Sequence, residues 1–238
     1  MKQKIMRRDH WHNAVSKYGM EEYMQDKVVL YHGSPNKVVT PTYGLGEDKH
    51  DYGKGFYLTE NLELAKEWAV CNPSKISGWV HQFELELTEL SVFDFSQHNI
   101  LCWLAELMKH RAADDSKRYR VLSEKFINRY GIDTSKYDVI KGWRANASYF
   151  YIAKSFVRDE IDVEILEELL SLGGLGLQYC MKTEKAYSML KATNTLFSVD
   201  YKEFNEKYNI RDQFARDNMK KLINSDKNKV TNVFSTLI

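Results

Sequence analysis

Hydrophobic residues alternate with polar ones in several short stretches of the chain. In the clearest case Trp79, Phe83 and Leu85 fall on one side of an extended backbone, and glutamates fall on the other. Such alternation, and short runs rich in β-branched and aromatic residues, predict β-strands. The sequence predicts strands at residues 28–32, 55–59, 79–87, 90–95, 137–143 and 177–183.

Other stretches carry apolar residues every three or four positions, which predicts amphipathic helices. Asn61 stands directly before one of them, and its side chain is expected to cap the first turn. The sequence predicts helices at residues 61–71, 100–111, 119–130, 148–157, 163–172, 184–191 and 205–223, a short helix within 1–27, and loosely held residues at 227–238. Because strands and helices are intermixed without an internal repeat, we predict an α+β fold.

The size and composition of the chain indicate a globular protein. A chain of 238 residues suits one large domain, or one domain with helical additions, and 43% hydrophobic residues are sufficient for a substantial core. The formal net charge of +1 provides no global field that would recruit nucleic acid or an acidic membrane. No run approaches the roughly 18 apolar residues of a membrane span, so no membrane partner is expected.

Cysteine usage and the first residues indicate the compartment. The three cysteines cannot all pair, and their spacing fits no zinc motif, so we expect free thiols in a reducing cytoplasm. The first ten residues are basic but lack an apolar core, and no signal peptide is therefore predicted. The glycines of residues 44–55 match neither a P-loop nor a dinucleotide fingerprint.

Two polar motifs flank a long loop at residues 33–54, and loops of this length are commonly functional. Tyr31-His32-Gly33-Ser34 closes the first predicted strand, and Asp51-Tyr52-Gly53-Lys54-Gly55-Phe56-Tyr57 leads into the second. Glycines in the second motif let the backbone approach a ligand closely. Trp68 follows on the helix that begins after Asn61. A histidine, a free backbone edge, a tyrosine and a tryptophan together suit a flat heteroaromatic ring that carries an amide.

This arrangement resembles the NAD-binding half of ADP-ribosyltransferases of the diphtheria-toxin and poly-ADP-ribose-polymerase type. It is most similar to a bacterial branch of that superfamily known as a domain of unknown function (DUF3990), which also separates its two stacking aromatics as Tyr57 and Trp68 are separated here. The resemblance implies a mixed split β-sheet core at 28–192 with a helical insertion at about 99–130. A helical N-terminal extension, 1–27, and a helical C-terminal tail, 193–238, complete the predicted domain organisation.

The resemblance also implies roles for the first motif, with NAD as the substrate and no metal. His32 is expected to bond a ribose hydroxyl of NAD, and the backbone N–H and C=O of Gly33 to clamp the nicotinamide carboxamide. Ser34 is expected to add a hydroxyl contact. The alternative is that His32 is an ordinary turn residue beside Gly-Ser.

In the second motif, Tyr57 and Trp68 are expected to enclose the nicotinamide ring. The ring of NAD is positively charged, so aromatic faces gain a cation–π attraction of up to ~2 kcal/mol. Tyr52 is expected to line the same pocket. The alternative is that Tyr57 and Trp68 are core aromatics.

The predicted third motif contains Gln178 and continues to Thr183-Glu184-Lys185-Ala186. Many relatives place a glutamate here, which grips the ribose 2′-hydroxyl and stabilises the oxocarbenium-like transition state. Gln178 accepts a hydrogen bond through its carbonyl oxygen but carries no full charge. The expected catalytic residues are Gln178, His32 and Tyr57; the alternative makes Gln178 a plain strand residue and assigns the chemistry to a carboxylate such as Glu160 or Glu184.

One segment departs from the resembled branch, where Ala-Asp-Asp follows the strand. This chain reads Arg144-Ala145-Asn146-Ala147-Ser148 and lacks both acids. If those acids bind the acceptor or brace the site in that branch, this protein differs in target or activity. Arg144 either contacts a phosphate or is an ordinary surface arginine.

The expected function is transfer of ADP-ribose from NAD to a macromolecular acceptor, protein or nucleic acid, with release of nicotinamide. The resemblance is compatible with a toxin, an effector delivered from the cytoplasm or a phage-defence enzyme, and with an antitoxin or immunity partner. The alternative is a module that binds NAD or a nucleotide with little turnover. A structural interaction protein is a third class, and it requires the pocket to be closed or filled.

Overall fold

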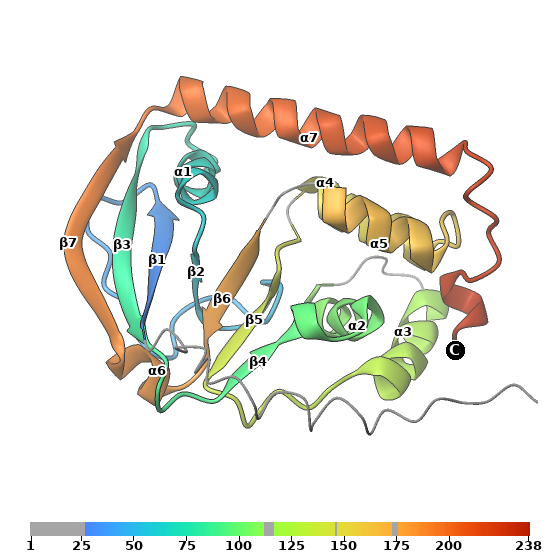
Figure 1. Ribbon diagram of the computed structural model, residues 1–238, viewed down its shortest axis with the longest axis horizontal. Coiled ribbons are helices and arrows are strands. Elements are labelled where there is room, and N and C mark those ends of the chain that lie inside the picture. Colours follow the sequence, from blue (N-terminus) through green and yellow to red (C-terminus); the bar gives the residue numbers. More distant parts are fainter. Residues whose placement is uncertain (1–26, 112–116, 146, 173–175) are drawn as a thin grey trace, which may run out of the picture.

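The computed structural model describes residues 27–111, 117–145, 147–172 and 176–238, and it has an α+β fold built on a seven-stranded mixed sheet (Figure 1). The strand order is β4-β5-β6-β2-β1-β3-β7, and all neighbours are antiparallel except β4 and β5. The strands are β1 (Lys27–Ser34), β2 (Phe56–Thr59), β3 (Gly78–Glu86), β4 (Val92–Asp94), β5 (Val139–Trp143), β6 (Leu177–Met181) and β7 (Leu190–Val199).

Helices follow the predicted positions through most of the described chain. They are α1 (Leu62–Val70), α2 (Ile100–His110), α3 (Lys117–Tyr130), α4 (Ala147–Val157), α5 (Val163–Leu172), α6 (Glu184–Ser188) and α7 (Tyr201–Ile223), with short 3-10 helices η2 (Phe95–Gln97) and η3 (Phe234–Thr236). The Asn61 side chain accepts a hydrogen bond from the backbone N–H of Leu64 at 3.1 Å, so the predicted cap of α1 is confirmed. The predicted helix within 1–27 lies outside the described residues.

The sheet is divided between β1 and β2. β1 pairs with β3 along its whole length but has a single register pair with β2, Tyr31 opposite Thr59. Beyond that pair the two halves of the sheet diverge, and α1 packs beside the divergence (Figure 1). Gly33 makes this packing possible, because a Cβ there would lie 2.0 Å from the Ala65 carbonyl oxygen of α1.

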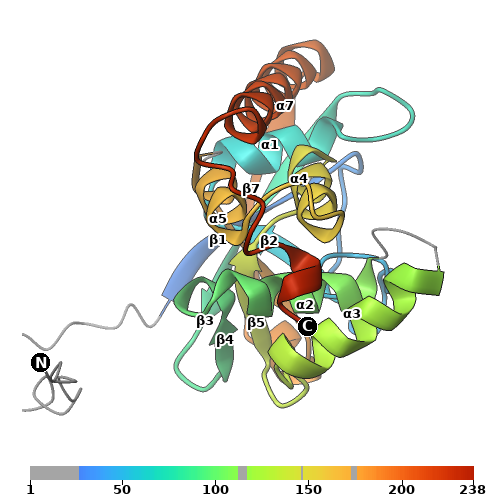
Figure 2. The same ribbon diagram turned by 90° about the vertical axis from the view of Figure 1, so that its right-hand side faces the viewer.

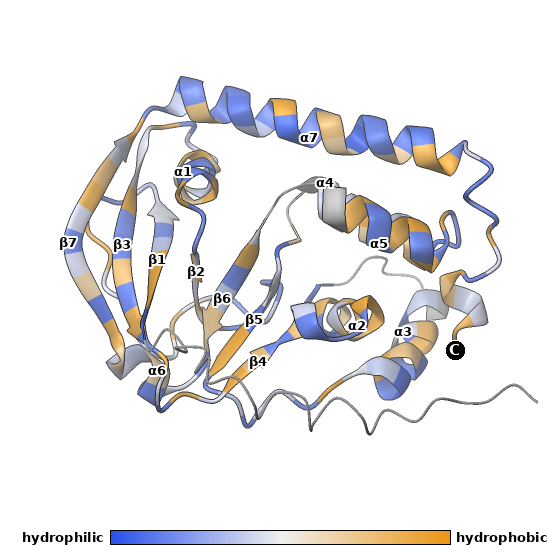
Figure 3. Cartoon of the chain, viewed as in Figure 1, coloured by the Kyte–Doolittle hydropathy of each residue, from blue (hydrophilic) through white to orange (hydrophobic). Residues whose placement is uncertain are grey.

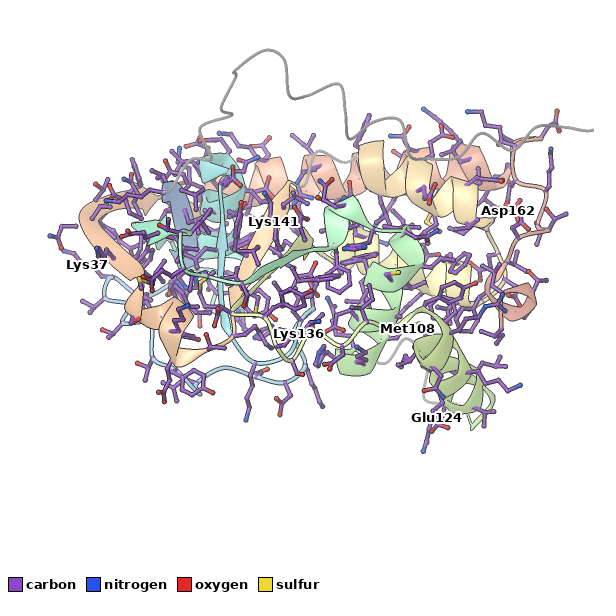
Figure 4. All side chains as sticks on the ribbon, turned by 60° about the horizontal axis from the view of Figure 1, so that its bottom comes forward. Lys37, Met108, Glu124, Lys136, Lys141 and Asp162 are labelled. Carbon is purple, nitrogen blue, oxygen red and sulfur yellow. The ribbon has the colours of Figure 1, made fainter. Side chains whose placement is uncertain are left out.

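The larger hydrophobic core lies between the β4-β5-β6 half of the sheet and helices α2 to α5 (Figure 1). Trp103 of α2, Phe126 of α3 and Phe156 of α4 are fully buried in it. Helices α2 and α3 lie between β4 and β5 in the chain, where the helical insertion was predicted. In Figure 4 Met108 lies where α2 meets α3, whereas Glu124 projects outward from α3.

The structure differs from the prediction around residue 192, where the core was predicted to end. Residues 190–199 form strand β7, although we predicted a helix up to residue 191 and a helical tail from 193. The reason is tertiary: β3 has β1 on one side only, and β7 pairs along its other edge from Gly78 to Leu85. The helical part of the tail begins one residue after Asp200, whose side chain caps α7 by accepting from the backbone N–H of Glu203.

The end of the chain is packed, so the prediction of loosely held residues at 227–238 is wrong. Phe234 of η3 is 1% exposed, and its ring lies 4.9 Å from that of Phe126. Burial of an aromatic ring of this size fixes the segment against α3 and α4.

Helix α7 crosses the molecule from β7 to the α4–α5 side (Figures 1 and 2). Most of its residues are hydrophilic, with hydrophobic positions interspersed (Figure 3), and Phe204, Ala215 and Met219 are buried. In the ranges that the structure describes, no helix combines the length and the apolar character needed to cross a membrane.

Candidate functional site

A cavity of about 330 Å³ lies where β1, β2, β6, α1 and the segment after β5 meet. Its volume is within the range of small-molecule sites. It brings together His32, Tyr57, Trp68 and Gln178, which the sequence predicted as site residues. The other residues that line it are His50, Asp51, Gly55, Phe56, Arg111, Arg144 and Ala145.

His32, on β1, is held in one tautomer. Its Nδ1–H donates to the Tyr57 carbonyl oxygen at 2.8 Å, because a carbonyl oxygen can only accept. The ring also stacks on Phe56 at 4.3 Å between centroids. Burial lowers the pKa of His32 from 6.5 to about 4, so the ring is neutral at pH 7 and its Nε2 is an acceptor. A neutral acceptor in the cavity suits a ribose hydroxyl donor.

Tyr57 contributes both a ring and a hydroxyl. Its ring lines the cavity, and its O–H donates to the Gly53 carbonyl oxygen at 2.6 Å while accepting from the Tyr52 N–H at 3.0 Å. The hydroxyl therefore fixes the end of the long loop against β2. Burial raises the pKa of Tyr57 well above its usual value, so the phenol stays protonated.

Tyr52 does not line the cavity as predicted. Its side chain is 0% exposed, and its ring lies behind Tyr57, with 6.5 Å between the two ring centroids. The O–H donates to the Trp143 carbonyl oxygen at 2.7 Å. The prediction that Tyr52 lines the pocket is therefore wrong: Tyr52 is a core residue that supports the Tyr57 ring from behind.

Gly33 and Ser34 lie next to the cavity but do not line it. Both pair with β3, opposite Val80 and Trp79, and β1 has no register pair with β2 beyond Tyr31 in the described chain. The other backbone edge of β1 is therefore outside the ladder at Gly33, and the carboxamide clamp stays a prediction. The Ser34 hydroxyl accepts from the Asn36 N–H at 3.1 Å and stabilises the turn that follows β1.

Trp68 and Arg144 lie against each other. The Arg144 guanidinium carbon is 4.6 Å from the centroid of the Trp68 ring, a cation–π contact. Trp68 thus lines the cavity, but one of its ring faces is covered by a cation.

Gln178, on β6, is 4% exposed and is held by its amide nitrogen. Its Nε2 donates to Asp51 Oδ2 at 2.8 Å and to the Trp143 carbonyl oxygen at 3.3 Å. Both partners accept only, so the amide orientation is determined by chemistry. The carbonyl Oε1 is the part of Gln178 left to accept a hydrogen bond from a ligand.

Asp51 is the central residue of this network, and we did not predict it. It is 7% exposed; Oδ1 accepts from Arg111 Nη1 at 2.6 Å, and Oδ2 accepts from the Ala145 N–H at 2.8 Å as well as from Gln178. Arg111 also donates to the Ala145 carbonyl oxygen at 2.6 Å. The carboxylate thus joins the long loop to α2, β6 and the segment after β5.

The sequence carried a partial signal for this network. Asp51 stands within the motif that we used to place Tyr52 and Tyr57, but a charged residue in a polar loop is unremarkable by itself. Arg111 follows α2, which we read only as an amphipathic helix. The alternative catalytic carboxylates, Glu160 and Glu184, do not line the cavity.

Comparison with known proteins gives one match. Residues 28–192 match the model of the family described as "Protein of unknown function (DUF3990)". No curated protein and no solved structure matches the chain. Because the family match spans more than half of the sequence, the chain belongs to the DUF3990 family.

Proposed function

We propose that the cavity binds the nicotinamide and ribose of NAD and that the protein is an ADP-ribosyltransferase with a split-sheet core of that superfamily. ADP-ribose passes to a macromolecular acceptor and nicotinamide is released. If the protein acts as a toxin, the proposal includes an antitoxin or immunity protein as its partner. Support comes from the resemblance of the motifs and from the convergence of His32, Tyr57, Trp68 and Gln178 on one cavity.

The observation that carries the proposal is the fixed orientation of Gln178. Asp51 and the Trp143 carbonyl hold its amide nitrogen, so the carbonyl oxygen is preorganised as an acceptor in the cavity. The Asp51 carboxylate also polarises the amide through this hydrogen bond, which increases the negative charge on the carbonyl oxygen. A glutamine held in this way partly replaces a carboxylate.

The chemistry requires such an acceptor. When the bond between the ribose C1′ and the nicotinamide nitrogen breaks, its electron pair leaves with nicotinamide and the ribose becomes cationic. The 2′-hydroxyl is then a better donor than in NAD, so an acceptor held against it binds the transition state more tightly than the substrate. The acceptor nucleophile adds to C1′ and loses its proton. Neutral His32 accepts from a second ribose hydroxyl in both states and so contributes mainly to binding.

A second candidate function is a module that binds NAD with little turnover. The observation in its favour is that the Asp51 charge is shared with Arg111, so none of the described residues that line the cavity offers an unpaired carboxylate. Such a site retains the binding contacts but stabilises the ribose cation less.

Nicotinamide release from NAD by the full chain tests the proposal. We expect Gln178→Ala to lower the single-turnover rate by ~10²–10³ and to change NAD affinity only a few-fold. Gln97→Ala, at an exposed glutamine outside the cavity, is the matched control and should match the wild type.

Three outcomes discriminate the candidates. Saturable thermal stabilisation by NAD without nicotinamide release supports the binding module. A wild-type rate in Gln178→Ala contradicts the role of Gln178. No stabilisation at millimolar NAD and no release contradict both candidates.

A further inference from the structure

Arg144 gives one wall of the cavity a chemistry that differs from the rest. It follows β5 and lines the cavity with its guanidinium 4.6 Å from the Trp68 ring centroid. An indole face that is covered by a guanidinium cannot at the same time stack on a positively charged nicotinamide. This wall is therefore suited to a different part of the ligand.

Arg144 has no carboxylate partner in the described part of the chain, because the neighbouring acids are committed elsewhere. Asp51, in the same cavity, accepts three hydrogen bonds from other groups. Glu67, one residue before Trp68 on α1, forms an ion pair with Arg211 of α7, and the Arg211 Nε lies 3.0 Å from Glu67 Oε2. Arg144 is left as an uncompensated cation.

Three buried N–H donors on or near this wall lack a hydrogen-bond partner within the described chain. The Trp68 Nε1, Arg144 Nη1 and Arg211 Nη1 groups are all buried, and none has a hydrogen-bond partner among the described residues. All three are N–H groups, so the missing partners are acceptors. Buried donors of this kind are normally satisfied, and an unsatisfied set marks a place for a ligand or an ordered molecule.

We propose that the wall formed by Arg144 and Trp68 is a phosphate subsite, which binds a phosphoryl group of the ligand through the Arg144 guanidinium. The inference rests on the proposed function in taking that group to be part of the diphosphate of NAD. Arginine suits this role because its planar fork donates two parallel hydrogen bonds to phosphate oxygens and is weakly hydrated.

The charge state is compatible with this role. Burial lowers the pKa of Arg144 to about 10, and Cys71 and Asp51 oppose this shift while Arg211 adds to it. The guanidinium therefore stays charged at pH 7. A phosphate brings the negative partner that Arg144 lacks, whereas Arg211 is already paired with Glu67.

Two consequences follow for the site. The nicotinamide ring stacks against Tyr57 and not against the face of Trp68 that Arg144 covers. Arg211 comes from α7, beyond the residues 28–192 that match the family, so helix α7 supports the subsite by keeping Glu67 away from Arg144.

Calorimetric titration of the full chain with two probes tests the subsite. ADP-ribose carries the diphosphate without nicotinamide, and nicotinamide riboside carries the nicotinamide without phosphate. We expect Arg144→Met to weaken ADP-ribose binding by about 10- to 100-fold and to change nicotinamide riboside binding less than about threefold. Arg144→Lys should fall between, because it keeps the charge and loses the fork. Arg158→Met, at an exposed arginine outside the cavity, should match the wild type.

Inorganic pyrophosphate provides a test without mutation, since it should raise the melting temperature of the wild type and not that of Arg144→Met. Unchanged ADP-ribose binding in Arg144→Met, equal weakening of both probes, or no effect of pyrophosphate on the wild type would overturn the subsite. If Arg144→Met does not fold, the pyrophosphate shift and Arg144→Lys decide. The two proposals can fail separately. If ADP-ribose binding depends on Arg144 but the wild type releases no nicotinamide from NAD, the subsite is supported and the proposed function is contradicted. If the wild type releases nicotinamide but Arg144→Met binds ADP-ribose as the wild type does, the proposed function is supported and the subsite is contradicted.

Discussion

Asp51→Asn is the substitution that the geometry makes most informative. The carboxylate accepts from Arg111, Ala145 and Gln178 at 2.6, 2.8 and 2.8 Å, so both of its oxygens act only as acceptors. Asparagine has the same shape but replaces one oxygen with an NH₂ donor. Whichever way the amide turns, that donor faces another N–H, and Arg111 loses its ionic partner.

The magnitude follows from these contacts. A hydrogen bond to a charged group contributes about 1.5–3 kcal/mol, and Asp51→Asn removes at least one and weakens the others. The Arg111 side chain is 26% exposed, which screens part of the loss. We therefore expect the free energy of unfolding to fall by about 2–3 kcal/mol, roughly a 30- to 150-fold change in the unfolding equilibrium.

Urea unfolding at pH 7 measures this change. Asp48→Asn is the matched control, because Asp48 lies in the same loop with a side chain 76% exposed, and its effect should stay below about 0.5 kcal/mol. Equal unfolding midpoints for the two variants would refute the idea that Asp51 organises the site.

Gln178→Glu tests how the contact between residue 178 and Asp51 affects both stability and NAD cleavage. Its new carboxylate would face Asp51 and the Trp143 carbonyl oxygen, so one of the two acids must hold a proton. We expect this variant to be destabilised at pH 7, to recover at lower pH, and to show no gain in NAD cleavage. The double variant Asp51→Asn/Gln178→Glu restores a donor–acceptor pair and should recover at least about 1 kcal/mol relative to additivity. Strict additivity would show that the two side chains are not coupled.

Three further predictions concern stability and NAD binding. Tyr57→Phe should lower the free energy of unfolding by about 1–3 kcal/mol and weaken NAD binding, because the hydroxyl no longer holds the loop at Gly53; no effect in either assay would contradict this role. The free energy of unfolding of the wild type should decrease as the pH is lowered from 6.5 to 4, because in this range only the unfolded chain protonates His32. The decrease due to His32 should total about 3 kcal/mol, and urea unfolding of His32→Gln across the same pH range should not show it. Gly33→Ala should lower stability by about 3 kcal/mol or more, because its Cβ would lie 2.0 Å from the Ala65 carbonyl oxygen; a normal melting temperature would disprove this contact.

The elements of the core were predictable where local signals are strong. Alternation over residues 79–87 and the helical spacing after Asn61 correctly indicated β3 and α1. Strand β7 was not predictable in this way. It is an edge strand in which most residues are exposed and half are polar, and its pairing depends on the free edge of β3, which no local pattern reveals.

The candidate site likewise contains residues that local motifs predicted and residues that they did not. His32, Tyr57 and Trp68 stand within or close to recognisable motifs, and they line one cavity. Asp51 and Arg111 are sixty positions apart, and their ion pair exists only because the long loop folds over the end of α2. Long-range pairing of charged residues leaves no periodic trace in a sequence, so the group that orients Gln178 emerged only from the structure.

The distribution of charge within the cavity supports the proposal that its ligand is NAD and not a simpler nicotinamide compound. Asp51 and Arg111 pair with each other, and His32 is uncharged at pH 7, so these three groups leave no net charge beside Gln178 and Tyr57. Arg144 leaves the neighbouring wall positive. A cationic nicotinamide alone would gain no ionic partner in either place. A ligand that joins a nicotinamide to a diphosphate matches both walls, since its ring can lie in the neutral part of the cavity while its phosphates satisfy the cationic part.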